Sequence, residues 1–264
     1  MSTIEGPQII SGGKLKIPSG KLSIVTPVIP PPPFSNSYSL LFDGSGDYVT
    51  SFGTGGGSAF TISFWLNMAI GFIGTYSWVF SNSSPASQGG IAVWIYYGIT
   101  ENRYIKVSCH SNVGGAFGNA HGSYEEGVND YEYDEWILFT MNWNGTTLKA
   151  YKNATEIVST TSGVADPGMG TMYIGQNGYN GGYHLGYIDE FAYWDAVLSP
   201  SAVTAIYNSG TPIDLTSNSG NYTNSGDLQR YLRLEEGSGT VATDTTGNDN
   251  GIITAATYSS TVPS

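Results

Sequence analysis

The chain has little cysteine, little charge and no long apolar run. Its 264 residues include one Cys, 9 Lys or Arg and 21 Asp or Glu. One cysteine excludes an intramolecular disulfide framework. The formal net charge of −12 argues against a nucleic-acid partner, which is bound mainly by Lys and Arg on phosphates. No stretch approaches the roughly 20 apolar residues of a membrane span, and the start, MSTIEGPQII, lacks the basic and apolar regions of a signal peptide.

Glycine and tyrosine are abundant instead, with 36 Gly and 19 Tyr, as expected for many tight turns between aromatic-rich strands. Apolar and β-branched runs bounded by Gly, Asn and Ser recur along the chain, which predicts about a dozen strands in two packed sheets. The strongest local signal is a hairpin from Trp136–Trp143 to Leu148–Tyr151 across Asn144–Gly145. The tryptophans inside strands are expected to be mainly core; these are Trp65, Trp94, Trp136, Trp143 and Trp194.

One stretch, GYIDEFAYWDAVLSPSAVTAIYNSG from Gly186 to Gly210, predicts a strand followed by a helix. Placing Ile188 and Phe191 on one face of the strand requires an extra residue, so we predict a β-bulge at Asp189–Glu190. Asp189 and Glu190 are adjacent in this strand and are expected to face opposite ways.

The helix after this strand has well-defined end signals. Ser199 is a good N-cap, Pro200 suits the first helical position, and Gly210 is expected to end the helix in a left-handed C′ position. A single amphipathic helix in an all-β chain is expected to be a lid on the edge or end of a sandwich.

This stretch resembles the closing motif of the laminin-G-like family, within the concanavalin A-like lectin/glucanase jelly rolls. The opening motif is similar too, as SLLFDGSGDYV (Ser39–Val49) followed by FTISFWLN (Phe60–Asn67). A third matching piece is EWILFTMNWNGTTLKAYKNATEI (Glu135–Ile157). The resemblance implies an all-β, two-sheet antiparallel jelly-roll sandwich with one short helix, of the kind found in structural proteins of tailed phages. It does not imply one activity, because this fold carries lectins, adhesion modules and enzymes.

The segment after residue 225 resembles one that often precedes a laminin-G-like domain. Here it comes last, as in a circular permutation, so Leu228–Leu234 and Ile252–Tyr258 are expected to join the same sandwich. We therefore predict one jelly-roll domain over residues 38–264, with a permuted C-terminal segment at 226–260.

Residues 1–37 differ from the rest in composition. They contain the run Pro30–Pro33, which favours a stiff extended spacer, and nine Ile, Leu or Val residues between Ile9 and Ile29. A segment this apolar is not expected to be a solvated tail. We interpret it as an N-terminal arm that anchors the chain to other subunits, the alternative being a strap on its own sandwich.

Two kinds of site are expected on this fold. The resemblance places Asp43 and Asp189 at positions where relatives often hold Ca²⁺. Aspartate also serves as an ordinary turn residue that bonds to its own backbone. A carbohydrate site is predicted in the glycine-rich loop, where amide and aromatic side chains are combined; its residues are Gln176, Asn177, Tyr179, Asn180, Tyr183 and His184.

Catalysis is not predicted. A retaining glucanase needs two carboxylates about 5 Å apart on one strand face, and neither Glu132 and Asp134 nor Asp189 and Glu190 has the usual Glu-x-Asp-x-x-Glu spacing.

The favoured function is a non-enzymatic virion structural or decoration protein. It would be located on a phage head, fibre or tail and held by the N-terminal arm to other virion subunits, as a homo-oligomer or on the capsid. Its lectin-like domain would face outward and bind glycans. The alternative is a free or cell-associated, extracellular carbohydrate-binding module. A glycan hydrolase or lyase is the third reading.

Overall fold

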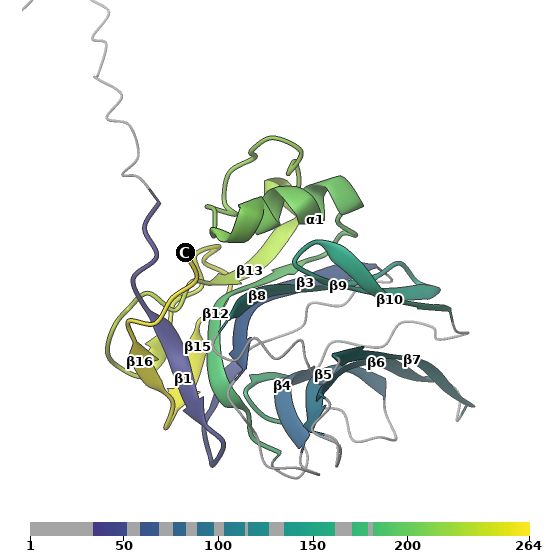
Figure 1. The fold of residues 1–264 in the computed structure, drawn as a ribbon, viewed down its shortest axis with the longest axis horizontal. Helices are drawn as coiled ribbons and strands as arrows, with labels where there is room; N and C mark the ends of the chain where they lie inside the picture. Colours follow the sequence, from purple (N-terminus) through teal and green to yellow (C-terminus); the bar gives the residue numbers. More distant parts are fainter. Residues whose placement is uncertain are drawn as a thin grey trace, which may run out of the picture. The chain divides into compact units, whose positions relative to one another are not determined.

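Two antiparallel β-sheets and one short helix make up the part of the chain that the computed structural model describes (Figure 1). The structure describes residues 34–51, 59–68, 76–82, 89–97, 103–113, 116–126, 135–161, 171–178 and 182–264. Residues 1–33 of the predicted arm, and the candidates Glu132, Asp134, Tyr179 and Asn180, lie outside these ranges.

The first sheet, called sheet A, has the strand order β10-β9-β8-β3-β12-β1-β16, and β13 also pairs with β12. Its strands are β1 (Ser39–Asp43), β3 (Phe60–Met68), β8 (Trp136–Trp143), β9 (Thr147–Lys152), β10 (Thr155–Thr161), β12 (Leu185–Trp194), β13 (Leu228–Leu232) and β16 (Thr257–Ser259).

The second sheet, called sheet B, has the order β14-β15-β2-β11-β4-β5-β6-β7. Its strands are β2 (Tyr48–Ser51), β4 (Tyr76–Asn82), β5 (Gly89–Tyr97), β6 (Arg103–Val113), β7 (Ala116–Glu126), β11 (Met172–Ile174), β14 (Val241–Ala242) and β15 (Gly251–Thr254). The all-β, two-sheet sandwich predicted from the sequence is confirmed.

The main core lies between the sheets and is filled by alternate residues of the strands. In β3 the inward residues include Phe60, Phe64 and Leu66, all fully buried. Phe64 stacks on Phe139 of the neighbouring β8, with ring centroids 5.3 Å apart. Each large apolar side chain buried in this way contributes about 1.5–3 kcal/mol to folding relative to exposure.

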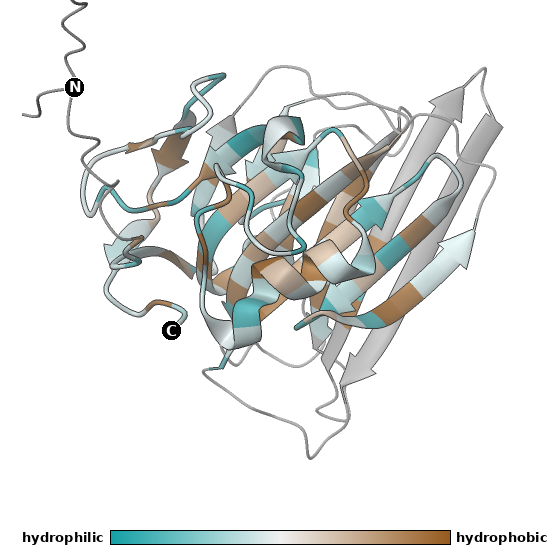
Figure 2. Cartoon of the chain, turned by 90° about the horizontal axis from the view of Figure 1, so that it is seen from above, coloured by the Kyte–Doolittle hydropathy of each residue, from teal (hydrophilic) through white to brown (hydrophobic). Residues whose placement is uncertain are grey.

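Helix α1 (Pro200–Tyr207) covers the outer face of sheet A, the face turned away from sheet B (Figures 1 and 2). Val203 and Ile206 pack there against Trp65 and Trp194, which are also buried. The prediction of a lid on the edge or end of the sandwich was therefore wrong. The outer positions of β3, β8 and β12 are apolar enough to bury a helix over the face of the sheet.

The helix begins as predicted and ends earlier. Ser199 is the N-cap, and its side chain accepts a hydrogen bond from the backbone N–H of Ala202; Pro200 occupies the first helical position. The left-handed C-cap is Asn208, with φ 45°, two residues before the predicted Gly210. Asn tolerates the left-handed region better than most non-glycine residues, and the 3₁₀ turn η1 (Asn208–Gly210) follows.

The predicted β-bulge in β12 is confirmed. Asp189 pairs with Trp65 of β3, but the next paired residue is Ala192, opposite Ser63, so the register shifts between Asp189 and Ala192. Glu190 takes a positive φ of 49° inside this bulge. The extra residue returns Ile188 and Phe191 to the core face, as their spacing required.

The C-terminal segment is built into both sheets. β13 pairs with β12 and β16 pairs with β1 in sheet A, while β15 pairs with β2 in sheet B. The short 3₁₀ turn η2 (Ser225–Asp227) comes directly before β13. Phe34–Ser264 form one compact unit. The predicted hairpin between β8 and β9 is also present, with Trp143 paired with Leu148 on either side of Asn144–Gly145. No helix among the described residues has the length and apolar character needed to cross a membrane.

Candidate functional site

On the outer face of sheet B, four aromatic side chains of two neighbouring strands form what we call the aromatic face: Tyr76 and Trp78 of β4, and Trp94 and Tyr96 of β5. Tyr76 pairs with Tyr96 and Trp78 with Trp94, so the four side chains form two rows across the strands. Their neighbours in β5, Val93 and Ile95, point the other way and are buried in the core. The period of two along each strand thus places every second residue of this segment outside.

The rings of each row are stacked on one another. The centroids of Trp78 and Trp94 are 5.0 Å apart with 24° between the ring planes, and those of Tyr76 and Tyr96 are 4.8 Å apart with 33°. Such pairs contribute about 0.5–1.5 kcal/mol beyond burial. The stacking holds the rings in place while leaving them accessible: Tyr76 is 54% exposed, and the other three are partly exposed.

A cation lies at one side of the aromatic face. Lys106 pairs with Trp94 in the ladder between β5 and β6, and its Nζ lies 5.1 Å from the centroid of the Tyr96 ring. This is the geometry of a cation–π contact. At an exposed site such a contact contributes roughly 0.5–1 kcal/mol.

The glycine-rich loop after β11 lies against the other side of the aromatic face. Gln176 and Tyr183 form an isolated β-bridge, and the N–H of Asn177 donates to the carbonyl of Gly182 at 3.2 Å. A Cβ atom on Gly182 would lie 2.2 Å from Cδ1 of Trp78. Only glycine permits this approach, so the loop and Trp78 form one continuous surface.

The predicted sugar-binding residues are therefore placed differently from one another. Asn177 and Tyr183 are partly exposed, whereas Gln176 is only 9% exposed. His184 is fully buried, and its Nδ1 lies 2.9 Å from Oγ of Ser77. Burial lowers the pKa of His184 to about 3, so the ring is neutral. A ring in this position faces the interior and does not reach a ligand in solvent.

The aromatic face itself was missed by the sequence prediction. Trp94 was expected to be mainly core, but it is half-buried on the outer face; Trp136 is also partly exposed, while Trp65, Trp143 and Trp194 are buried as predicted. The signal was present in β5, where Val93 and Ile95 alternate with Trp94 and Tyr96. All four are apolar or aromatic, so the run is typical of a strand buried on both faces.

A second cluster of polar groups lies at the bulge of β12. Asp189, Glu190 and Glu235 each place a carboxylate oxygen within 4.8 Å of those of the others. Asp189 and Glu190 are buried, with 0% and 2% exposure. The expectation that these two neighbours would face opposite ways was wrong, because the positive φ of Glu190 interrupts the alternation.

The cluster holds residues Phe34–Tyr38, the segment that leads into β1. Asn36 Nδ2 donates to Asp189 at 2.9 Å, and the backbone N–H of Ser37 donates to Glu235 at 2.9 Å. Arg233 Nε lies 3.1 Å from Glu190, and the guanidinium also contacts the carbonyl of Ser35 and the ring of Phe34, whose centroid is 4.2 Å away. This segment is therefore fixed to β12 and to the residues that follow β13.

Burial raises the pKa values of both carboxyl groups at the bulge, those of Asp189 and Glu190. Burial raises the pKa of Glu190 to about 7, against the opposing effects of the Arg233 charge and the hydrogen bond from the Tyr231 hydroxyl. Burial, reinforced by the neighbouring charge of Glu190, raises the pKa of Asp189 well above its usual value. Added positive charge would therefore favour the ionised form of this cluster.

The cluster has the donor set of a divalent-cation site, but it does not include Asp43. Oxygen ligands are available from Asp189 and Glu235, and Oδ1 of Asn36 is buried without a hydrogen-bond partner. Asp43 pairs with Leu185, four residues before Asp189 along β12, which is about 13 Å at about 3.3 Å per residue. Asp43 also accepts a hydrogen bond from the N–H of Ser45, as a turn residue does. The two predicted ligands cannot hold one ion together.

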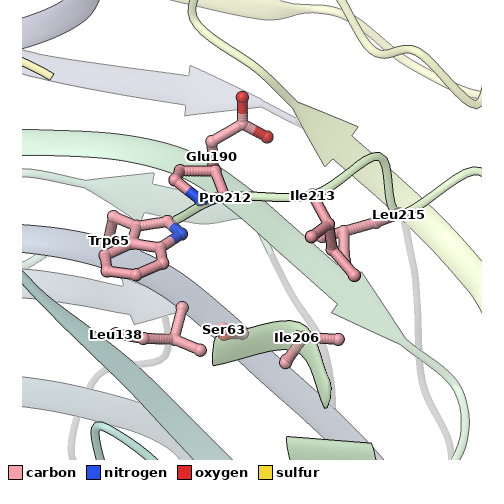
Figure 3. Close-up of a pocket in the computed structure, with 8 residues that line it drawn as sticks. All are labelled: Ser63, Trp65, Leu138, Glu190, Ile206, Pro212, Ile213 and Leu215. Carbon is pink, nitrogen blue, oxygen red and sulfur yellow. The ribbon is translucent and has the colours of Figure 1, made fainter. Parts of the chain in front are cut away.

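The cavity beside the carboxylate cluster is too small for a sugar substrate. A cavity of about 10 Å³ lies next to Glu190, beneath the segment that follows α1 (Figure 3). It is lined by Ser63, Trp65, Leu138, Glu190, Ile206, Pro212, Ile213 and Leu215. That volume accommodates about one water molecule. The Ser77–His184 pair is buried as well, so it is not presented as a nucleophile and base.

Comparison with known proteins gives one family and a set of similar folds. A family model described as the concanavalin A-like lectin/glucanases superfamily matches residues 43–204. A putative carbohydrate binding protein from Bacteroides ovatus is similar in structure, with a TM-score of 0.60 and 17% identity, over 88% of this chain and 62% of that one. Tailspike protein 2 from the Escherichia coli O157:H7 bacteriophage CAB120 has a TM-score of 0.52 and 11% identity, over 76% of this chain and 30% of that one. A search of curated protein sequences finds no match.

Proposed function

Because the chain belongs to the concanavalin A-like lectin/glucanase superfamily, we propose that it binds glycans, without turnover, on the aromatic face of sheet B. The observation that carries this proposal is the pair of stacked ring rows beside the glycine-rich loop. The four rings remain partly exposed, so a ligand can pack on them. The similarity in fold to a putative carbohydrate binding protein agrees with it.

The chemistry of the surface suits a saccharide. The C–H face of a sugar ring packs on an aromatic ring, and polar side chains at the edge fix its orientation. Tyr76 is the most exposed ring of the aromatic face and stands at the end of its row. Asn177 and Tyr183 supply hydrogen-bonding groups on the adjacent loop, and Gln176 lies beside them. Of the predicted loop residues that the structure describes, Gln176, Asn177 and Tyr183 are thus retained as the polar edge of the site, with His184 as a buried support.

The test is binding of the purified chain to a glycan array and to soluble oligosaccharides by calorimetry. Replacing Trp94 or Tyr76 with Ala should weaken binding at least about tenfold, which is roughly 1.4 kcal/mol. Tyr38→Ala is the matched control, because Tyr38 is 39% exposed but precedes β1 in sheet A. Equal binding by all three variants would contradict the proposal.

The finer proposal is a virion structural role, with the glycan surface displayed on a phage particle and the N-terminal segment bound to other subunits. The fold similarity to a phage tailspike supports it. Under this proposal the chain should be present stoichiometrically in purified particles. A variant lacking residues 1–33 should stay folded, since the contacts of Asn36 and Ser37 are kept, but should no longer join the particle.

A free, extracellular carbohydrate-binding module is the alternative. It would bind glycans equally well with or without residues 1–33, and it would not co-purify with particles.

Ca²⁺ is proposed as a ligand of the cluster formed by Asp189, Glu235 and Asn36, where it would supply positive charge to a buried, acid-rich site and stabilise the fold around it.

A further inference from the structure

Three side chains form a row on the outer face of sheet A, on the opposite side of the sandwich from the aromatic face. Asn67 of β3 pairs directly with Trp136 of β8 on one side and with Tyr187 of β12 on the other. All three point outward, because their neighbours Leu66, Ile137 and Ile188 belong to the core. We call this row the Trp136–Asn67–Tyr187 notch.

The two aromatic rings lean toward each other above the amide. Strands lie about 4.8 Å apart, so side chains two strands apart start roughly 10 Å from each other. The ring centroids of Trp136 and Tyr187 are only 6.2 Å apart, with 50° between their planes. Asn67 is accordingly 1% exposed, while both rings remain partly exposed.

The amide of Asn67 is not satisfied. Its Oδ1 is buried and has no hydrogen-bond partner. The other outward polar residues of the same strands do have partners: Thr61 bonds to Asn142, and Ser63 to Thr140. These four lie in the rows of the sheet that α1 and the following segment cover, whereas Asn67 lies beyond them. An unmade hydrogen bond at a buried acceptor costs about 1–3 kcal/mol, so a donor is missing at this place.

We propose that the notch is a second saccharide-binding site, separate from the aromatic face. A sugar hydroxyl donates to Oδ1 of Asn67, and the C–H face of the same sugar packs on the ring of Trp136 or Tyr187 when the two rings part. A purely apolar ligand would leave Oδ1 of Asn67 without a hydrogen bond. A simple cation would not cover the apolar surface of the two rings. A saccharide supplies both the donor and the apolar surface that the notch lacks.

The site can be followed through the indole N–H of Trp136 by NMR of the full-length chain. The probes are methyl β-D-galactopyranoside and N-acetyl-D-glucosamine, each added to millimolar concentration. The Trp136 signal should shift with saturation on at least one of them. Asn67→Leu, which keeps the size and removes the acceptor, should weaken that binding at least about tenfold, whereas Tyr187→Phe, which keeps the ring, should leave it within about twofold.

The same titration in a Trp94→Ala background separates this inference from the proposed function. A Trp136 shift that persists in this background supports the second site whatever the aromatic face does. A Trp94 shift in the native chain without a Trp136 shift would leave the proposed function standing and overturn the second site. Absence of any Trp136 shift with both probes, or an Asn67→Leu variant that binds as well as the native chain, would overturn it too.

Discussion

Gly182 lies directly against the indole of Trp78. A Cβ atom built on Gly182 would be 2.2 Å from Cδ1 and 2.6 Å from Nε1 of that ring. The loop that contains Gly182 and the strand that contains Trp78 are more than a hundred residues apart in sequence, and they meet at a distance that no other residue type allows.

Gly182→Ala should therefore displace either the loop or the Trp78 ring and weaken glycan binding about as much as removing a ring does, roughly tenfold. Gly226→Ala is the control, because a Cβ there meets nothing within 4 Å. Calorimetry with the best oligosaccharide from the array measures both. Unchanged binding by Gly182→Ala would show that the ring and the loop do not act as one surface.

The buried His184 should make the native chain sensitive to acid. Burial holds its pKa at about 3, below the usual 6.5, so between these values the unfolded state binds a proton that the folded state does not. Stability from this group is present above about pH 6.5 and is lost as the pH falls toward 3, by up to about 1.4 kcal/mol per pH unit.

His184→Phe should flatten this part of the pH profile, measured as the difference in thermal midpoint between the variant and the native chain from pH 7.5 to 4.5. The difference between the two proteins cancels titration of groups that they share, such as Glu190. A constant difference across the range would mean that the ring takes up its proton at the same pH in the folded and unfolded states.

The carboxylate cluster gives a metal prediction. Millimolar CaCl₂, added after treatment with a chelator, should raise the thermal midpoint of the native chain by a few degrees, since a ligand at about 100 times its dissociation constant stabilises by about 2.7 kcal/mol. Asp189→Asn should abolish the increase. Asp43→Asn should not, because the register of β1 and β12 places Asp43 away from the cluster.

The opposite result is equally informative for this site. If Ca²⁺ leaves the native midpoint unchanged, Arg233, 3.1 Å from Glu190, suffices as the counter-charge of the cluster.

The N-cap of α1 gives a stability prediction. Ser199→Ala removes the acceptor for the N–H of Ala202 and should lower the free energy of unfolding by about 1 kcal/mol. Ser201→Ala removes an exposed hydroxyl that lies 2.9 Å from Oγ of Ser199 but keeps the acceptor for the N–H of Ala202, so it should change stability by less than about 0.5 kcal/mol. Chemical denaturation with a common m-value compares the two. Equal effects would mean that the helix is held only by its packing on Trp65 and Trp194.

Local rules explain most of what could be predicted. The spacing of Ile188 and Phe191 was enough to place the bulge, since a strand has only two faces, and Ser199–Pro200 was enough to start the helix. The end of the helix was misplaced because Asn208 adopts the left-handed conformation that Gly210 was expected to supply.

The face covered by the helix and the position of the aromatic face depend on contacts between distant segments. Val93 and Trp94 look equally suited to a core when the sequence is read alone, and only the pairing of β5 with β4 shows that one faces the core and the other faces Trp78. Likewise, nothing local to Asn36 indicates that it bonds to Asp189, 153 residues later.

The fixing of residues 34–38 has a mechanical consequence. A pull on the N-terminal end would first load the bonds from Asn36 to Asp189 and from Ser37 to Glu235, and would reach the ladder of β1 only after those contacts rupture. Because β1 lies between β12 and β16 inside sheet A, tension would then have to shear a strand held on both sides. Tension applied at residue 34 would therefore be resisted first by these two contacts and then by the ladders on both sides of β1.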